Sequence, residues 1–444
     1  MQNKLDTIED INPESLLSIL RDYYAELENN YSPIVVNLKR HSTPVNFKES
    51  LSIPIHRWYN YKEGFSPKFV RDFIQKYASS TEDVVFDPFG GVGTTVLEAS
   101  LLGYQAYSTD VNPLGNFASK VKSRIYTQTD IAKLKQQLVK LASIKDFQIT
   151  CDVPNSTVVS YFLDETYNSL LQIISYIRSI EDKTVRDFFQ LALLSIVEIL
   201  STHKKDGNGL KRKKNPPIPM SMTDVISLLS ERIHTYIEDI ANSSVKVEPT
   251  IFYQSNIDNY SLPRKADIVI TSPPYANCFD YSKVYMNELW VGGFFLSSKD
   301  QTIFREKSVS SHVHYRWQRR NEEYTNLVVD KYINRILATR KLWSNTIPEM
   351  LSGYFSDMGK FLYVLSQNLN KGATVGIVVG NSVYAGLVIP TDLLLASMAE
   401  NLGYDIEGIQ IYRELSSSPQ QMKLVSDQDR KYLRESLIIL KWNK

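Results

Sequence analysis

Two patterns of apolar and polar residues follow each other along the chain, and each predicts a different kind of element. Short apolar runs rich in valine, isoleucine, tyrosine and phenylalanine, bounded by turn residues, are typical of strands. Seven such runs occur, at residues 82–88, 104–110, 248–256, 266–272, 373–380, 404–412 and 436–442. Between the first two, the segment TTVLEASLLG has helical spacing and closes on a glycine. Residues 82–110 are therefore predicted to form a β-α-β unit.

The middle of the chain follows a helical pattern. From about 128 to 240, apolar residues recur at helical spacing, as in IAKLKQQLVKLA and YNSLLQIISYIRSI, and the stretch 204–219 interrupts them. A second stretch without strand patterns runs from about 290 to 345. We therefore predict an α/β fold with a Rossmann-like, mostly parallel sheet of seven strands that carries helical and basic insertions.

This organisation divides the chain into six consecutive parts. They are an N-terminal segment (1–80), the first part of the sheet domain (81–127), a helical insertion (128–245), the central part of the sheet domain (246–290), a basic and aromatic insertion (291–345) and the remainder of the sheet domain (346–444).

Length, composition and net charge limit the classes of protein to which this chain can belong. A chain of 444 residues with 43% hydrophobic and 22% charged residues suits a globular protein with one large core or two smaller ones. The net charge of +1 means that nucleic-acid binding would depend on local basic patches. Two cysteines, Cys151 and Cys278, exclude a disulfide framework and a cysteine-rich zinc site. The start of the chain lacks an apolar signal region and no stretch is apolar enough to span a membrane, so we expect a cytoplasmic protein.

The motif FDPFGGVGTT places three glycines between a predicted strand and a predicted helix. Gly90, Gly91 and Gly93 let the backbone approach a ligand and leave the helix N-terminus open. The loop lacks the Gly-Lys-Ser/Thr ending that holds a nucleotide triphosphate, and by itself it is also compatible with a plain tight turn. Asp110 ends the next strand, where the ribose hydroxyls of a ligand would be bound. Together they predict an adenosine-containing cofactor.

The apolar run ADIVI at 266–270 predicts a buried strand, which two prolines must end. Because proline lacks a backbone donor and fixes its own φ, residues Ser272 to Tyr275 are expected to form a stiff loop at the carboxyl end of that strand. Open α/β sheets bind their ligands at this edge.

The motifs DPFGGVGTT, STDVNP and TSPPY together resemble those of the S-adenosylmethionine-dependent DNA methyltransferases that act on exocyclic amino groups, the N4-cytosine and N6-adenine enzymes. The resemblance implies S-adenosylmethionine as the cofactor, no metal, and double-stranded DNA as the partner. In a restriction-modification system, a cognate restriction endonuclease acting on the same site would be a further partner. The cofactor-binding residues that it implies are Asp87, Phe89, Gly91, Gly93, Thr94 and Asp110.

Two further segments extend the implied cofactor site. YKEGFSPKFV resembles the segment that closes over the methionine end of the cofactor, which adds Phe65 and Ser66. The family often has an aspartate that contacts the adenine of the cofactor after the strand preceding the catalytic loop. This chain has Asn256 there, with Asp258 two residues on.

By the same resemblance, the catalytic residues are Ser272, Pro273, Pro274 and Tyr275. The Ser272 hydroxyl and the Pro273 carbonyl would accept the hydrogens of the target amino group and so localise its lone pair towards the methyl group. Tyr275 would stack on a base extruded from the duplex. A serine before the prolines favours N4-cytosine in this family, whereas aspartate or asparagine usually accompanies N6-adenine.

The alternatives stay open at this point. The glycine loop precedes SPPY, unlike the permuted order common among N4-cytosine enzymes, so an N6-adenine DNA methyltransferase is the second reading. An RNA-base or protein-amide methyltransferase and a non-catalytic DNA-binding subunit are further alternatives. Cys278 does not directly follow a proline as the nucleophile of C5-cytosine enzymes does, so we expect a buried, inert thiol.

Two basic stretches are candidates for DNA contact. KKDGNGLKRKK is expected to be flexible and suits phosphate contact, with a solvated loop as the alternative. Its candidate residues are Lys211, Arg212, Lys213 and Lys214. HVHYRWQRR mixes arginine, histidine and aromatic residues, and is the candidate target-recognition segment. Its candidates for reading guanine edges in the major groove are Arg316, Arg319 and Arg320.

Overall fold

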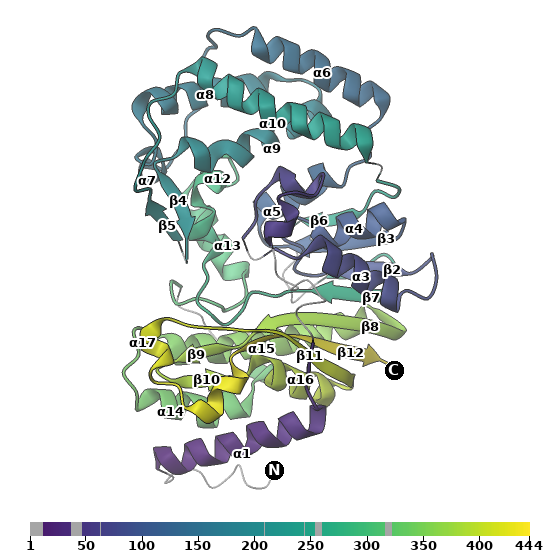
Figure 1. The fold of residues 1–444 in the computed structure, drawn as a ribbon, viewed down its shortest axis with the longest axis vertical. Coiled ribbons are helices and arrows are strands. Elements are labelled where there is room, and N and C mark those ends of the chain that lie inside the picture. The colour runs from purple at the N-terminus through teal and green to yellow at the C-terminus, as the bar shows by residue number, and fades with distance from the viewer. Residues whose placement is uncertain are drawn as a thin grey trace. The chain divides into compact units, whose positions relative to one another are not determined.

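The computed structural model describes residues 12–36, 47–62, 64–207, 209–243, 245–253, 260–315 and 322–444. The chain divides into two compact units built from interleaved segments. The first unit comprises residues 1–44, 255–279 and 306–444, and the second comprises residues 45–254 and 280–305. Both units contain strands and helices (Figure 1).

In the second unit, three described strands form a parallel arrangement in the order β2-β3-β6. They are β2 (Val84–Asp87), β3 (Gln105–Asp110) and β6 (Thr250–Tyr253). Helix α4 (Thr94–Leu102) joins β2 to β3 and ends at Gly103, whose φ of 100° suits glycine. The predicted β-α-β unit is therefore confirmed. Helix α5 (Pro113–Lys122) follows β3, with Asn112 as its N-cap.

The predicted helical insertion is also helical in the structure. Its described helices are α6 (Gln128–Ala142), α7 (Ser156–Val159), α8 (Asp164–Ser179), α9 (Lys183–Leu200) and α10 (Met222–Asn242). Helix α10 packs against α6, α8 and α9 (Figure 1). Trp58 lies in this core, with its ring stacked on that of Tyr236 at 4.5 Å and in edge-to-face contact with that of Phe188 at 5.3 Å. Burying side chains of this size stabilises the helices by roughly 1.5–3 kcal/mol each.

The lysine-rich stretch between α9 and α10 differs from its prediction. It is not simply a flexible loop, because β4 (His203–Asp206) and β5 (Gly209–Arg212) pair there as an antiparallel hairpin. Gly207 adopts a φ of 53° in the connection. A short glycine-containing connection suits the twist of a hairpin, which favours pairing over an open loop.

The remaining described elements of the second unit are short, apart from α3 and α13. They are α2 (Phe47–Ser50), the 3-10 helix η2 (His56–Trp58), α3 (Pro67–Tyr77), α11 (Tyr281–Val284), α12 (Met286–Val291) and α13 (Ser298–Lys307).

In the first unit, a described sheet has the order β1-β11-β12-β8-β7. Its strands are β1 (Ile34–Val35), β7 (Ala266–Thr271), β8 (Leu369–Gly380), β11 (Asp405–Glu414) and β12 (Arg434–Trp442). β7 is parallel to β8 and β1 is parallel to β11, whereas β12 is antiparallel to both of its neighbours. All seven predicted strands are thus confirmed within the described residues, and the fold is of the predicted Rossmann-like α/β class with mostly parallel strands.

Helices accompany this sheet in the first unit. The longer ones are α1 (Pro13–Tyr31), α15 (Ile347–Gln367) and α16 (Thr391–Leu402), and α16 packs against both α1 and α15. Shorter elements are η3 (Glu322–Tyr324), the π-helix η4 (Val329–Ile333), α14 (Asn334–Ala338), β9 (Ser382–Tyr384), β10 (Leu387–Ile389), α17 (Pro419–Met422) and η5 (Asp427–Tyr432). Among the described residues, no helix combines the length and the apolar character that crossing a membrane requires.

Candidate functional site

The glycine loop between β2 and α4 is closely packed. The backbone nitrogen of Gly90 donates to the carbonyl of Thr109 at 3.0 Å, and that of Gly93 donates to the carbonyl of Gly90 at 2.8 Å. A Cβ on Gly93 would lie 2.7 Å from the Cβ of Ser119, and Gly93 has a φ of 79°. Glycine is therefore required at this position both by space and by conformation. No side chain of the described residues caps the N-terminus of α4, which leaves this end of the helix suited to an acceptor group.

Asp110 connects the end of β3 to the glycine loop. Its Oδ2 accepts a hydrogen bond from the backbone nitrogen of Gly91 at 2.7 Å, and its Oδ1 accepts one from that of Asn112 at 2.7 Å. Burial raises the pKa of the Asp110 carboxyl, and these hydrogen bonds oppose the rise. A carboxylate accepts about four hydrogen bonds, so these two leave acceptor capacity for ribose hydroxyls. The structure brings together the predicted residues Asp110 and Gly91.

Asp87 supports the same loop from the end of β2. Its Oδ1 accepts from the backbone nitrogen of Phe89 at 3.1 Å, and its Oδ2 accepts from the hydroxyl of Thr95 at 2.6 Å. Asp87 and Thr94 are buried and Phe89 is partly exposed. The hydrogen bonds show a structural role for Asp87, and direct contacts of these three residues with a cofactor stay a prediction.

Phe65 and Ser66 lie directly before α3. Ser66 is the N-cap of this helix, since its hydroxyl accepts from the backbone nitrogen of Phe69 at 3.3 Å. The same hydroxyl donates to Glu49 Oε2 at 2.5 Å. Phe65 is buried, with its ring 6.1 Å from that of Phe69. Both predicted residues therefore fix the conformation of this segment, and their contact with a cofactor stays a prediction.

Tyr61 is a residue of this region that the motifs did not single out. A Cβ on Gly91 would lie 3.2 Å from a carbon of the Tyr61 ring, and Asn112 Nδ2 donates to the Tyr61 hydroxyl at 3.4 Å. The ring stacks on that of Tyr285 at 4.7 Å and on that of Tyr281 at 6.1 Å. Tyr61 therefore contacts the glycine loop and is itself supported by two further tyrosine rings. Tyr61 is far from both in the sequence, so no local pattern could reveal these contacts.

Lys122 is a second such residue. It is fully buried, and its Nζ donates to the carbonyl of Val92 in the glycine loop at 3.0 Å. Burial lowers the pKa of Lys122 to about 7, although attraction to Glu98 opposes the decrease. Glu98 is itself paired with His56 at 2.8 Å and with Arg71 at 2.7 Å. The only signal in the sequence was a lysine on the apolar side of a helix.

The SPPY loop belongs to the first unit, where it directly follows β7 as predicted. Ser272 and Tyr275 are partly exposed, and Pro273 is buried. The Tyr275 hydroxyl donates to Glu435 Oε1 on β12 at 3.2 Å. A Cβ on Gly380, at the end of β8, would lie 2.7 Å from carbons of the Tyr275 ring. The neighbouring strands therefore position the tyrosine.

The end of the loop is also fixed. The Tyr384 hydroxyl donates to the carbonyl of Ala276 at 2.6 Å, and the backbone nitrogen of Cys278 donates to the carbonyl of Ser311 at 2.9 Å. Cys278 is only 2% exposed, and burial raises the pKa of its thiol. The prediction that Cys278 is buried is confirmed, and the raised pKa disfavours the reactive thiolate.

The predicted DNA-contacting residues divide into two groups. Lys211, Arg212 and Lys214 are exposed on or beside β5. Lys213 is less exposed, and its Nζ donates to the carbonyls of Glu198 and Ile199 at 2.7 and 3.2 Å, at the end of α9. Five further predicted residues lie outside the described part of the chain: Asn256, Asp258, Arg316, Arg319 and Arg320.

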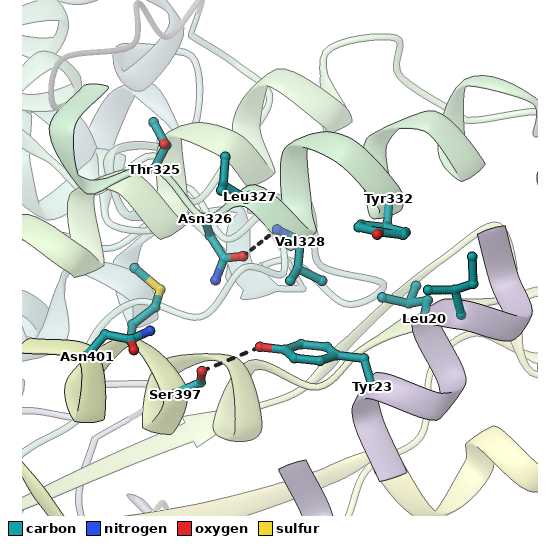
Figure 2. Close-up of a pocket in the computed structure, with 11 residues that line it drawn as sticks. Leu20, Tyr23, Thr325, Asn326, Leu327, Val328, Tyr332, Ser397 and Asn401 are labelled. Carbon is teal, nitrogen blue, oxygen red and sulfur yellow. Dashed lines mark hydrogen bonds between the residues drawn. The ribbon is translucent and has the colours of Figure 1, made fainter. Parts of the chain in front are cut away.

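A cavity of about 370 Å³ in the first unit is separate from these motifs. Residues of α1, α16 and the segment 325–332 line it (Figure 2). Figure 2 shows the Tyr23 hydroxyl next to that of Ser397, at 3.4 Å, and Asn326 next to Val328. None of the predicted cofactor, catalytic or DNA-binding residues that the structure describes is among its lining residues.

Comparison with known proteins gives consistent matches. A family model described as DNA methylase, of the N6/N4 type, matches residues 28–114, which include the glycine loop and Asp110. The type II methyltransferases M.BsoBI of Geobacillus stearothermophilus and M.AvaI of Nostoc sp. are each 28% identical to the chain. These alignments cover 94% and 90% of this chain and 91% and 88% of the two relatives. M.MvaI of Kocuria varians is 26% identical over 50% of this chain and 53% of its own length.

The glycine loop and Asp110 fit S-adenosylmethionine. The glycines let the loop pack against Ser108 and Ser119, the uncapped N-terminus of α4 suits an acceptor group, and the adjoining carboxylate keeps acceptor capacity. When bound, this cofactor supplies an activated methyl group. The motifs, the family-model match over residues 28–114 and the similarity to type II methyltransferases along most of the chain support the family of S-adenosylmethionine-dependent DNA amino-methyltransferases.

Proposed function

We propose that this protein methylates the exocyclic N4 of cytosine in duplex DNA, at a specific site and with the target base extruded from the helix. The observation that carries the proposal is the SPPY loop, in which Ser272 is partly exposed at the carboxyl end of β7. A serine at this place, where the family also uses aspartate or asparagine, favours cytosine. The reaction is proposed to take place in the cytoplasm, and a restriction endonuclease acting on the same site is the proposed functional partner.

The proposed chemistry needs two acceptors and a stacking surface. An exocyclic amino group is a poor nucleophile because its lone pair is delocalised into the ring. Ser272 Oγ and the carbonyl oxygen of Pro273 accept its hydrogens and localise the lone pair, and the prolines keep the carbonyl in place. The Tyr275 ring, positioned by Gly380 and Glu435, stacks on the extruded base.

DNA binding is proposed to use both basic segments. Lys211, Arg212 and Lys214 are exposed and suit phosphate contacts, which hold the duplex without reading its sequence. Arg316, Arg319 and Arg320 remain the proposed readers of guanine edges. N6-adenine is the second candidate target, because the glycine loop precedes SPPY in the chain.

Single-turnover methyl transfer by Ser272→Ala tests the proposed catalytic loop. Loss of one acceptor should lower the rate on the order of a hundredfold and leave cofactor affinity nearly constant, since the interaction is stronger in the transition state. Ser417→Ala, which changes an exposed serine of the same unit, is the matched control. Mass spectrometry of the nucleosides then distinguishes N4-methylcytosine from N6-methyladenine. A full rate for Ser272→Ala would refute the proposed role, and N6-methyladenine would refute the proposed target.

Tyr275→Ala tests base extrusion separately. Loss of the stacking surface should cost about 1–3 kcal/mol in holding the extruded base. Part of this cost should disappear on a duplex with the target base in a mismatch, because a mispaired base is easier to extrude. Equal costs on matched and mismatched duplexes would contradict the stacking role.

A further inference from the structure

A cavity of about 280 Å³ in the second unit is lined by charged residues that no motif predicts as a site. Its lining residues come from the segment around η2, from α9, β4, α10 and α12, and from Lys213 directly after β5. Its charged lining residues are Arg57, Glu198, Lys205, Lys213, Arg232 and Glu288. Four cations and two carboxylates give this lining a net positive charge, which favours an anionic ligand.

Both lining carboxylates are paired with one lysine. Lys205 on β4 is 7% exposed, and its Nζ lies 3.0 Å from Glu198 Oε2 and also contacts Glu288 Oε1. Arg57 is likewise paired, at 2.6 Å from Asp239 Oδ1. These pairs hold the walls of the cavity and neutralise most of its charge locally.

Arg232 on α10 differs from these paired cations. Within the described part of the chain it makes no ion pair and no side-chain hydrogen bond, and it is only partly exposed. Lys213 donates to the carbonyls at the end of α9, which carry no formal charge. Among the described residues, Arg232 and Lys213 are therefore the two lining cations that are not paired with a carboxylate. Of the two, Arg232 has the larger number of available hydrogen-bond donors.

The Tyr59 hydroxyl is a second feature that indicates a ligand. Tyr59 lines the cavity and is 3% exposed. Among the described residues its hydroxyl makes no hydrogen bond of ordinary geometry, although the Glu288 carboxylate, whose Oε2 likewise has no partner, lies near it. Burial raises the pKa of Tyr59 well above its ordinary value, with a contribution from Glu288, so the hydroxyl keeps its proton and can donate. An unsatisfied buried polar group costs roughly 1–3 kcal/mol, a cost that a ligand oxygen would remove.

We propose that this cavity binds a phosphate group, with Arg232 as its charged donor and the Tyr59 hydroxyl as its neutral donor. Arginine matches the oxygens of phosphate in a bidentate geometry, and it binds them more strongly than neutral donors do. The DNA backbone and inorganic phosphate both offer this chemistry. The hairpin that contains Lys205 also carries the exposed residues Lys211 and Arg212, which favours the backbone as the source. With the DNA backbone as the source of the phosphate, the inference rests on the proposed function.

Two variants and one control test the cavity. Arg232→Gln removes the charge, Tyr59→Phe removes only the hydroxyl, and Arg178→Gln removes an exposed arginine of the same unit that does not line the cavity. For a backbone phosphate, Arg232→Gln should weaken binding to duplexes of every sequence and lower the slope of log K against log salt by about one unit. The control should retain the slope of the unchanged protein. Tyr59→Phe should weaken binding several-fold without lowering the Tm.

Inorganic phosphate distinguishes the two sources. If phosphate alone raises the Tm of the unchanged protein but not that of Arg232→Gln, while the salt slopes for DNA are equal, the cavity binds free phosphate. If Arg232→Gln and Arg178→Gln behave alike with both probes, the inference is overturned, and DNA methylation by the unchanged protein still supports the proposed function. Failure of the unchanged protein to bind DNA would contradict the proposed function, and the phosphate measurement would still decide the inference.

Discussion

Asp110 holds Gly91 by a hydrogen bond, and we propose that its remaining acceptor capacity binds the ribose of the cofactor. We expect Asp110→Ala to weaken binding of S-adenosylmethionine by roughly 1.5–3 kcal/mol, the scale of a charge-assisted hydrogen bond. Calorimetry without added metal measures this change. Asp110→Asn retains one acceptor oxygen and should weaken binding less. Unchanged affinity in a folded Asp110→Ala protein would remove the assigned ribose contact.

Lys122 gives the stability of the protein a predictable pH dependence. Its pKa is about 7 in the fold against an ordinary value of 10.5, so between these values the unfolded chain binds a proton that the folded chain does not. Stability should therefore rise with pH in this window, by about 2 kcal/mol between pH 7 and pH 9. Lys122→Met should remove this contribution, which denaturant unfolding at both pH values measures. An equal pH dependence in both proteins would show that Lys122 is not neutral in the fold.

At the scale of elements, the basic residues on and directly after the β4–β5 hairpin differ in their exposure to solvent. Lys211, Arg212 and Lys214 are exposed, whereas Lys213 binds the last carbonyls of α9. Changing Lys211, Arg212 and Lys214 to Gln should weaken binding to all DNA sequences alike. It should also lower the salt slope by about one unit for each phosphate that the hairpin no longer neutralises.

The control for the hairpin variant removes the same number of positive charges from another part of the same unit. Changing Lys135, Lys140 and Lys145, which are exposed on or directly after α6, to Gln removes three charges outside the hairpin. This variant should retain the salt slope. A hairpin variant with altered sequence preference and normal binding to non-specific DNA would reverse the proposed division between phosphate contact and base reading.

At the scale of the whole molecule, the first unit combines segments from both ends of the chain. Arg434 on β12 is buried and bonds to Asp392 on α16 at 2.8 Å and to Glu28 on α1 at 3.1 Å. We expect Arg434→Met to destabilise this unit by about 3–5 kcal/mol, because Asp392 would be deprived of its cation while remaining buried. Hydrogen exchange of α1 and β12 measures the destabilisation.

Lys431 provides the comparison for Arg434, because it pairs with the same Glu28 but its side chain is 55% exposed. Lys431→Met should therefore cost at most about 1 kcal/mol. Equal destabilisation by the two variants would contradict the argument that burial makes the Arg434 pair important.

The sequence by itself determined seven of the strands, the β-α-β unit and the motifs. These features depend on neighbours in the chain: an apolar run, a proline that ends it, or glycines before a helix. The glycine loop, Asp110 and the loop after β7 were predicted because each is local. The hairpin at 203–212 was missed because its pairing competes with solvation of a lysine-rich stretch, and local composition does not decide between them.

Only the tertiary structure decided which distant residues meet. Tyr61 stacks on Tyr285, and Lys122 lies beneath the glycine loop, because packing brought these side chains together from separate segments. The free energy of such contacts depends on burial and on the partners present, and the local sequence around a residue determines neither. For the same reason, the proposed phosphate donors Arg232 and Tyr59 could be recognised only from the cavity that they share.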